Sequence, residues 1–197
     1  MIYRTPPRTQ ELDARLTELD GLRDALGREV SNPSPWLGTQ RHLAKASMVE
    51  SSVSIEGYEV AEGEALAIVS GTESVEPDDE NRMAVACYAR AMDHVGVMAL
   101  DPAFEWRDRV ILDLHFDACY FQRDKSPGLW RTGPIYVTGS DGRPIYDGPE
   151  ANGVVGLMAE VVEWLRTGGL DAHVAVRGAM AHLHTVSVHP FRDGNGR

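Results

Sequence analysis

Apolar residues recur every three or four positions along most of this chain, and this periodicity limits it to a largely helical fold. The segment 10–30 follows the spacing most clearly, with charged residues between its leucines at Leu12, Leu16, Leu19, Leu22 and Leu26. Prolines at 33 and 35 separate this segment from the next. Further helices are predicted at 37–55, 62–69, 81–99, 104–122, 150–166 and 172–186, with Gly57 as a C-cap and Asp171 as an N-cap.

The apolar period changes between Gly133 and Tyr146. Two short extended runs, 135–138 and 144–146, flank the sequence Gly-Ser-Asp-Gly, which is typical of hairpin turns. The sequence therefore predicts a mainly α fold with one β-hairpin.

The charge of the chain restricts its partners. Thirty acidic residues outnumber nineteen Lys and Arg, so the formal net charge is −11. Such a surface repels phosphate backbones and anionic lipid, so we expect no nucleic-acid or membrane partner, and any nucleotide must be held by a local site. Cys87 and Cys119 fall in helix-like apolar patterns, which favours buried thiols in a reducing compartment. The first residues lack the apolar region of a signal peptide, and we expect a cytoplasmic protein.

The last nine residues, HPFRDGNGR, combine a base, a carboxylate, two glycines and a cation. Gly194 and Gly196 flank Asn195 and permit unusual backbone angles, so successive N–H groups can point into one concavity and bind an anion. Arg197 adds a bidentate contact suited to phosphate. This stretch therefore predicts a phosphate-binding loop.

His189 and Asp193 bring acid–base and metal chemistry to the same loop. Histidine titrates near neutral pH and suits a general base, and Asp193 offers the hard oxygen that Mg²⁺ prefers. Asp-Gly and Asn-Gly are also common turn dipeptides, which leaves a purely structural turn as an alternative. A calcium loop is a second alternative, but Phe191 or Arg197 would occupy a ligand position in either register.

HPFRDGNGR resembles the signature of the Fic family, His-x-Phe-x-Asp/Glu-Gly-Asn-Gly-Arg, at all seven fixed positions. The resemblance implies a helical Fic-type bundle and transfer of AMP from ATP to a Ser, Thr or Tyr hydroxyl of a target protein. By this resemblance His189 deprotonates the hydroxyl, Asp193 binds Mg²⁺, and Phe191 anchors the loop in the core. Residues 194–196 would hold the phosphates, with Arg197 as a clamp.

A second stretch is similar to the family's flap, a hairpin beside the active site that docks a target segment by strand pairing. The similarity lies in Arg131, in the run that contains Ile135, Tyr136 and Val137, and in Tyr146. An exposed strand edge offers unpaired N–H and C=O groups, so such docking is physically reasonable. A hairpin that only covers the core is the alternative.

The third stretch resembles the family's inhibitory motif, Ser/Thr-x-x-x-Glu-Gly/Asn, through Ser52, Glu56 and Gly57. Ser52 and Glu56 are four residues apart, so both lie on one helix face. The resemblance implies a class II, self-inhibited member in which Glu56 obstructs the ATP γ-phosphate. A solvated surface charge is the alternative for a lone helical glutamate.

The chain stops at Arg197, before the family motif's second arginine and the helix that follows it. We therefore expect a fragment or a truncated chain. In the family the inhibitory Glu pairs with the second motif arginine; if the 197 residues are the whole molecule, we expect little or no catalysis and a pairing of Glu56 with Arg197 instead. Residues 1–70 are expected to form an N-terminal helical region that carries the inhibitory motif at 52–57. Residues 71–197 are expected to form the shortened catalytic domain.

These features together predict a protein adenylyltransferase that is self-inhibited by Glu56. ATP is the expected substrate, Mg²⁺ the cofactor, and the partner is a protein target, with self-modification and a homodimer both allowed. One alternative is a hydrolase in which Glu56 orients a water that removes AMP. Another is a non-catalytic module that binds a nucleotide or a partner. A different nucleotide donor also stays open, because the loop recognises phosphates better than bases.

Overall fold

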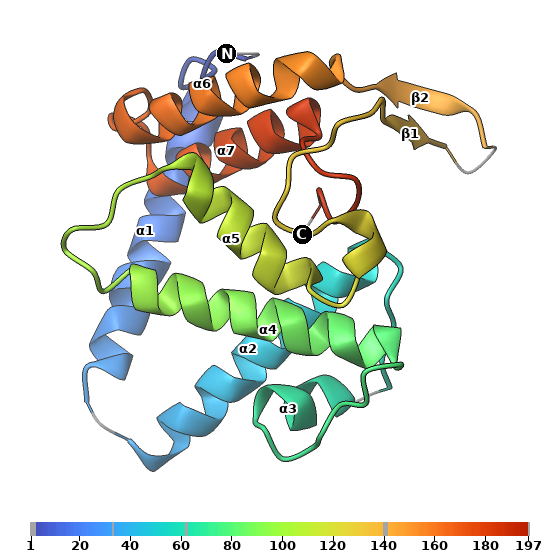
Figure 1. Ribbon diagram of the computed structural model, residues 1–197. Helices are drawn as coiled ribbons and strands as arrows, with labels where there is room; N and C mark the ends of the chain where they lie inside the picture. Colours follow the sequence, from blue (N-terminus) through green and yellow to red (C-terminus); the bar gives the residue numbers. More distant parts are fainter. Residues whose placement is uncertain (1–2, 33, 62, 140–141, 197) are drawn as a thin grey trace.

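The computed structural model describes residues 3–32, 34–61, 63–139 and 142–196 (Figure 1). The described residues form a helical bundle with one two-stranded hairpin, which confirms the predicted mainly α fold. The elements in chain order are α1 Gln10–Val30, α2 Pro35–Ile55, α3 Glu64–Val69, α4 Glu80–Met98, α5 Asp108–Cys119, the 3₁₀ turn Arg123–Lys125, β1 Tyr136–Thr138, β2 Pro144–Asp147, the 3₁₀ turn Ala151–Gly153, α6 Val154–Thr167 and α7 Val174–Val188.

Several helix ends differ from the prediction. Helix α2 begins at Pro35, where the missing N–H of proline costs no hydrogen bond. Asp171 is not the N-cap of α7, so that prediction was wrong. The preceding loop turns once more, with Ala172 N–H donating to Gly169 O at 3.0 Å, and the helix is capped by His173. The Nδ1 of His173 accepts from the N–H of Ala175 at 3.1 Å.

Helices α2, α3 and α4 share one hydrophobic core. Buried side chains from all three helices meet there, including Val53 from α2, Ile68 from α3 and Val85 from α4. Helix α5 packs along α4, and Cys87 and Cys119 are buried thiols in this region, as predicted. The domain boundary expected at residue 70 stays a prediction, and it falls within this shared core.

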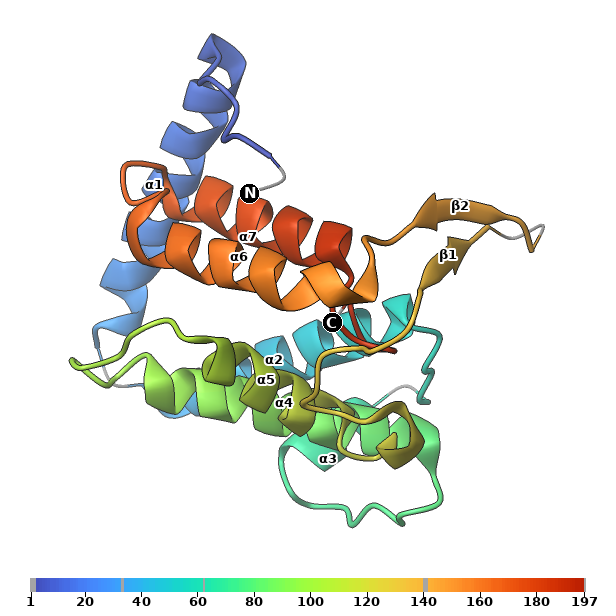
Figure 2. The same cartoon turned by 45° about the horizontal axis from the view of Figure 1, so that its top comes forward.

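Helices α6 and α7 form a second layer. Figure 2 shows them side by side above α2, α4 and α5, with the C-terminal loop between the two layers. Their own core contains Met158 and Trp164 from α6 together with Met180 and Val188 from α7. The segment 189–196 begins where α7 ends and faces the first layer.

Helix α1 runs along the flank of the bundle (Figure 2). Leu16 is its one buried leucine, whereas the side chains of Leu22 and Leu26 are each 63% exposed. An Asp20 oxygen lies 3.1 Å from the Nε2 of His173, which ties α1 to the start of α7. No helix formed by the described residues has the length and apolar character needed to cross a bilayer.

Candidate active site

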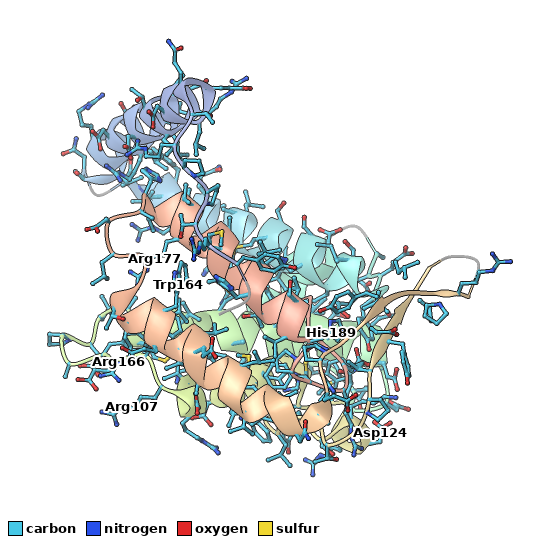
Figure 3. The ribbon with its side chains drawn as sticks, turned by 90° about the horizontal axis from the view of Figure 1, so that it is seen from above. Arg107, Asp124, Trp164, Arg166, Arg177 and His189 are labelled. Carbon is cyan, nitrogen blue, oxygen red and sulfur yellow. The ribbon has the colours of Figure 1, made fainter. Side chains whose placement is uncertain are left out.

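The end of α7 sets the position of His189. This residue adopts left-handed backbone angles (φ 50°, ψ 59°), which are uncommon outside glycine and often mark functional positions. Its N–H donates to Thr185 O at 2.9 Å, and its Nδ1 lies 3.1 Å from Val186 O. Because a carbonyl only accepts, Nδ1 carries a proton in this contact, and in the neutral imidazole Nε2 then carries the lone pair. Figure 3 shows His189 at the flap side of α7, where this half-exposed imidazole suits a general base.

The loop after His189 is closed by its own side chains. Phe191 is buried and stacks on the ring of His115, with centroids 3.6 Å apart and planes 4° from parallel. The Oδ1 of Asn195 accepts from Phe191 N–H at 2.9 Å, and its Nδ2 donates to Phe191 O at 3.0 Å. The side chain of Asn195 therefore holds the loop together. The core position expected for Phe191 is confirmed.

Asp193 is held from three directions. Its Oδ1 accepts from Gly194 N–H at 2.7 Å, and its Oδ2 accepts from the Nε2 of Gln122 at 2.9 Å. Its carbonyl lies 3.0 Å from the Nε2 of His115. Because Gly128 N–H donates to the Nδ1 of His115 at 2.9 Å, the ring proton is on Nε2 and points at Asp193 O. His115 is therefore a neutral donor that fixes the loop backbone.

The donor set around Asp193 fits Mg²⁺. Each oxygen of a carboxylate accepts about two hydrogen bonds, so the single bond that the described residues make to each oxygen leaves one lone pair on it unused among them. The described residues contain no cluster of three or more His, Cys, Asp or Glu side chains that would complete a zinc site. A single carboxylate matches Mg²⁺, which keeps several waters and takes its other ligands from substrate phosphates.

Helix α2 ends in a Schellman turn that carries Glu56. Gly57 has a φ of +85° and donates to Ser54 O at 3.0 Å, while Tyr58 N–H donates to Val53 O at 3.2 Å. Gly57 is thus the helix-ending glycine that the sequence predicts. The two bonds fix the direction in which the Glu56 side chain leaves the helix.

Glu56 reaches the glycine loop across 140 residues of sequence. Its Oε1 accepts from Gly196 N–H at 2.8 Å. A Cβ at Gly196 would lie 2.5 Å from this oxygen, so the approach depends on glycine. Ser52 lies one turn earlier on α2, and no hydrogen bond among the described residues joins it to the loop. Arg197, the predicted clamp and partner of Glu56, lies outside the described residues.

The hairpin projects from the helices beside the C-terminal loop (Figure 1). Tyr136 pairs with Asp147 and Val137 with Tyr146 in antiparallel register. Within the described residues no further strand covers the other edge of β1. The side chain of Tyr136 is 58% exposed, and Ile135 and Val137 are half-buried.

Arg131 connects the base of the hairpin to the catalytic loop. Its side chain is only 3% exposed, and burial lowers the pKa of its guanidinium. Its Nε donates to His189 O at 2.7 Å, Nη1 to Gly133 O at 2.8 Å and Nη2 to Pro149 O at 2.6 Å. A cavity of about 280 Å³ lies between this hairpin base and Arg192. One side chain therefore holds both the base of the hairpin and the backbone of His189.

Sequence reasoning missed His115 and Gln122, which both contact Asp193. They are seven residues apart, which corresponds to about two helical turns. Two polar side chains on the apolar side of a predicted helix are the signal that points to a buried polar site.

Comparison with known proteins agrees with this geometry. Residues 106–197 match the Fic/DOC family. The chain is 28% identical over 208 residues to the protein adenylyltransferase Fic of Drosophila erecta, and 28% identical over 209 residues to that of Aedes aegypti. Each alignment covers 98% of this chain and 38% of the relative, so the chain spans well under half of the curated relatives it matches.

Solved structures give the same fold. Fic-1 of C. elegans (aa 134–508) aligns with a TM-score of 0.74 and 25% identity, over 95% of this chain and 54% of the other. A Fic domain containing signaling protein from Bacteroides thetaiotaomicron aligns with a TM-score of 0.75 and 18% identity, over 92% of this chain and 68% of the other. The helical bundle with its hairpin is therefore the fold of these Fic structures.

Proposed function

We propose that this chain, whose residues 106–197 match the Fic/DOC family, is a protein adenylyltransferase that transfers AMP from ATP to a target hydroxyl. The observation that carries the proposal is the anion contact of the loop, where Gly196 N–H binds the Glu56 carboxylate at 2.8 Å. A loop that binds one anionic oxygen beside an imidazole has the properties that phosphate transfer requires. Relatives named protein adenylyltransferase Fic support the same reaction.

His189, the loop 194–196 and Asp193 have different roles in the proposed reaction. The Nε2 of His189 accepts the proton of the target hydroxyl, and the hydroxyl oxygen then forms a bond to the α-phosphorus of ATP. The bond from this phosphorus to the β-phosphate bridging oxygen breaks, and pyrophosphate leaves. In the loop 194–196, where Gly194 N–H already donates to Oδ1 of Asp193, the remaining backbone N–H groups stabilise the charge on the phosphates. Asp193 would hold Mg²⁺, which supplies charge neutralisation when it is bound with the nucleotide.

Self-inhibition by Glu56 is part of the proposal. A carboxylate on Gly196 N–H occupies a donor that a phosphate oxygen would otherwise use. Its negative charge also repels an incoming triphosphate at short range. We therefore expect Glu56 to hinder productive binding of ATP through the loop backbone, in addition to any contact with Arg197.

The flap would dock the target. An extended target segment can add to the open edge of β1, with Ile135, Tyr136 and Val137 as the contact residues. This arrangement would present the target hydroxyl next to the base held by Arg131. Self-modification, a homodimer and a cytoplasmic location stay predictions.

Mass spectrometry tests the proposal directly. The wild-type chain, Glu56→Gly and the double variant Glu56→Gly/His189→Ala are incubated with ATP, Mg²⁺ and a lysate. We expect Glu56→Gly to attach AMP to itself or to a lysate protein, and the labelled fraction to be larger than with wild type. The double variant should attach none. Glu59→Gly is the matched control, because Glu59 lies exposed three residues further along.

Two results would contradict the assignments. Labelling that persists without His189 removes it as the base, and equal labelling by wild type and Glu56→Gly removes the inhibitory role. Loss of AMP from a modified target that requires Glu56 would instead favour the hydrolase.

A further inference from the structure

Gln122 links two parts of the site that the proposed mechanism treats separately. It follows α5, and its side chain is 8% exposed. Its Nε2 donates to the hydroxyl of Tyr58 at 2.7 Å and to Oδ2 of Asp193 at 2.9 Å. One amide nitrogen therefore joins the segment after Glu56 to the acidic residue of the loop.

The orientation of this amide is fixed by chemistry. An ionised carboxylate only accepts hydrogen bonds, so the NH₂ group and not the oxygen of Gln122 must face Asp193. Both N–H groups are then used, one on each partner. The Oε1 of Gln122 is buried and has no hydrogen-bond partner among the described residues. An unpaired buried acceptor lowers the stability of the fold, so packing alone does not favour glutamine at position 122.

The second partner belongs to the turn that carries Glu56. Tyr58 lies two residues after Glu56, and its N–H closes the Schellman turn on Val53. Its ring packs edge to face on Phe121, with centroids 5.5 Å apart and planes at 84°. The inhibitory turn thus meets the catalytic loop at two points: directly through Glu56, and through Tyr58 and Gln122.

We infer that Gln122 is a positioning residue that orients the Asp193 carboxylate for a metal–nucleotide complex and ties this carboxylate to Tyr58 of the inhibitory turn. The inference rests on the proposed function, because it takes Asp193 as the Mg²⁺ ligand. The bond from Gln122 to Oδ2 and the bond from Gly194 to Oδ1 fix the plane of the carboxylate. Partners of this kind commonly set both the orientation and the affinity of a metal ligand.

The first experiment removes the donor. Gln122→Met keeps a side chain of similar length and deletes both N–H groups. Binding of Mn²⁺, used as a paramagnetic substitute for Mg²⁺, is measured by electron paramagnetic resonance on the full chain with α,β-methylene-ATP. We expect the Mn²⁺ dissociation constant to rise about tenfold, while the metal-free affinity for the analogue changes little. The matched control is Gln40→Met, since Gln40 is exposed on α2 and far from the loop in sequence.

The second experiment tests the link to the turn. Tyr58→Phe deletes one hydroxyl and keeps the ring on Phe121, so the fold should tolerate it. We expect a smaller rise in the Mn²⁺ dissociation constant than for Gln122→Met. The double variant Tyr58→Phe/Gln122→Met should match Gln122→Met alone, because Gln122→Met already removes the hydrogen bonds that connect Tyr58 to Asp193. Fully additive effects would overturn the link between the turn and the metal ligand.

The outcomes separate this inference from the proposed function. Equal Mn²⁺ binding by wild type and Gln122→Met overturns the inference and leaves AMP transfer intact. Because Glu56 is expected to hinder nucleotide binding, every Mn²⁺ comparison is repeated in the Glu56→Gly background. Equal Mn²⁺ binding by Glu56→Gly and Glu56→Gly/Asp193→Ala, or none by Glu56→Gly, removes the metal role of Asp193 and the inference with it. If Gln122→Met loses its cooperative thermal transition, Tyr58→Phe decides, and unchanged Mn²⁺ binding by Tyr58→Phe overturns the inference.

Discussion

Gly194→Ala tests whether the catalytic loop depends on a left-handed glycine in close contact with α5. Gly194 has a φ of +71°, and a Cβ there would collide with the Sγ of Cys119 and lie 3.4 Å from the Nε2 of His115. The left-handed backbone costs alanine about 1–2 kcal/mol. Overpacking against a buried thiol adds about 1–3 kcal/mol. We therefore expect the free energy of unfolding to fall by about 2–5 kcal/mol.

Urea denaturation followed by circular dichroism measures this loss. The control is Gly178→Ala on α7, where a Cβ meets nothing within 4 Å, and it should stabilise the chain by about 0.5–1 kcal/mol. Cys119→Ala removes the colliding sulfur, so Gly194→Ala should cost less in that background, with only the backbone strain left. A Gly194→Ala variant within about 0.5 kcal/mol of wild type, or an equal cost in both backgrounds, would refute this account of the loop.

Two further predictions concern α7 and the flap. His184 is fully buried against Trp164, and burial lowers its pKa, so the unfolded chain binds a proton more readily than the fold does. The free energy of unfolding should therefore fall as the pH decreases below about 6.5. His184→Leu should lose this pH dependence in urea titrations at acid pH. A pH dependence equal to that of wild type would contradict the role of His184. The hydroxyl of Tyr146 donates to Ser187 O. Tyr146→Phe should speed amide hydrogen exchange in β1 and β2 about fivefold, which corresponds to a loss of about 1 kcal/mol in the free energy of opening the hairpin. Tyr136 is exposed, so Tyr136→Phe should not speed exchange. Equal exchange rates in the two variants would argue against Tyr146 as an anchor.

Helix positions followed from apolar periodicity, but helix ends did not. The period shows which residues share a face, and it extends across the stretch that forms α7. The cap depends on where the preceding loop stops turning. Asp171 is a good capping residue by type, yet the turn from Gly169 to Ala172 places it before the helix and leaves the cap to His173.

Helix α1 shows a second limit of periodicity. The spacing of its leucines correctly gave a helix from Gln10 to Val30. It also implied a buried apolar face, but Leu22 and Leu26 lie mostly exposed. A period identifies the residues on one face, whereas burial requires another element over that face, and this depends on how the whole chain is arranged.

The part of the site whose residues lie close together in the sequence was predictable. His189 and Asp193 lie within one motif, and the structure places both in the segment that follows α7, while their roles stay predictions. His115 and Gln122 were missed because their contacts with Asp193 span 78 and 71 residues. Taken singly, neither residue has a local pattern that distinguishes a buried hydrogen bond from a solvated position; only their shared spacing of seven residues on the apolar side of the predicted helix gives a signal.

The contact of Glu56 shows why the partner of a charged residue is harder to predict than its location. Sequence resemblance placed Glu56 near the loop but paired it with an arginine, because a sequence motif identifies side-chain partners and not backbone partners. The partner that the described residues provide is the backbone N–H of Gly196, which any residue possesses and which only a glycine leaves open to so close an approach. The same lack of a side chain would let a phosphate oxygen reach that N–H. Under the proposed function, the glycine that would admit a phosphate of ATP therefore also admits the carboxylate that would compete with it.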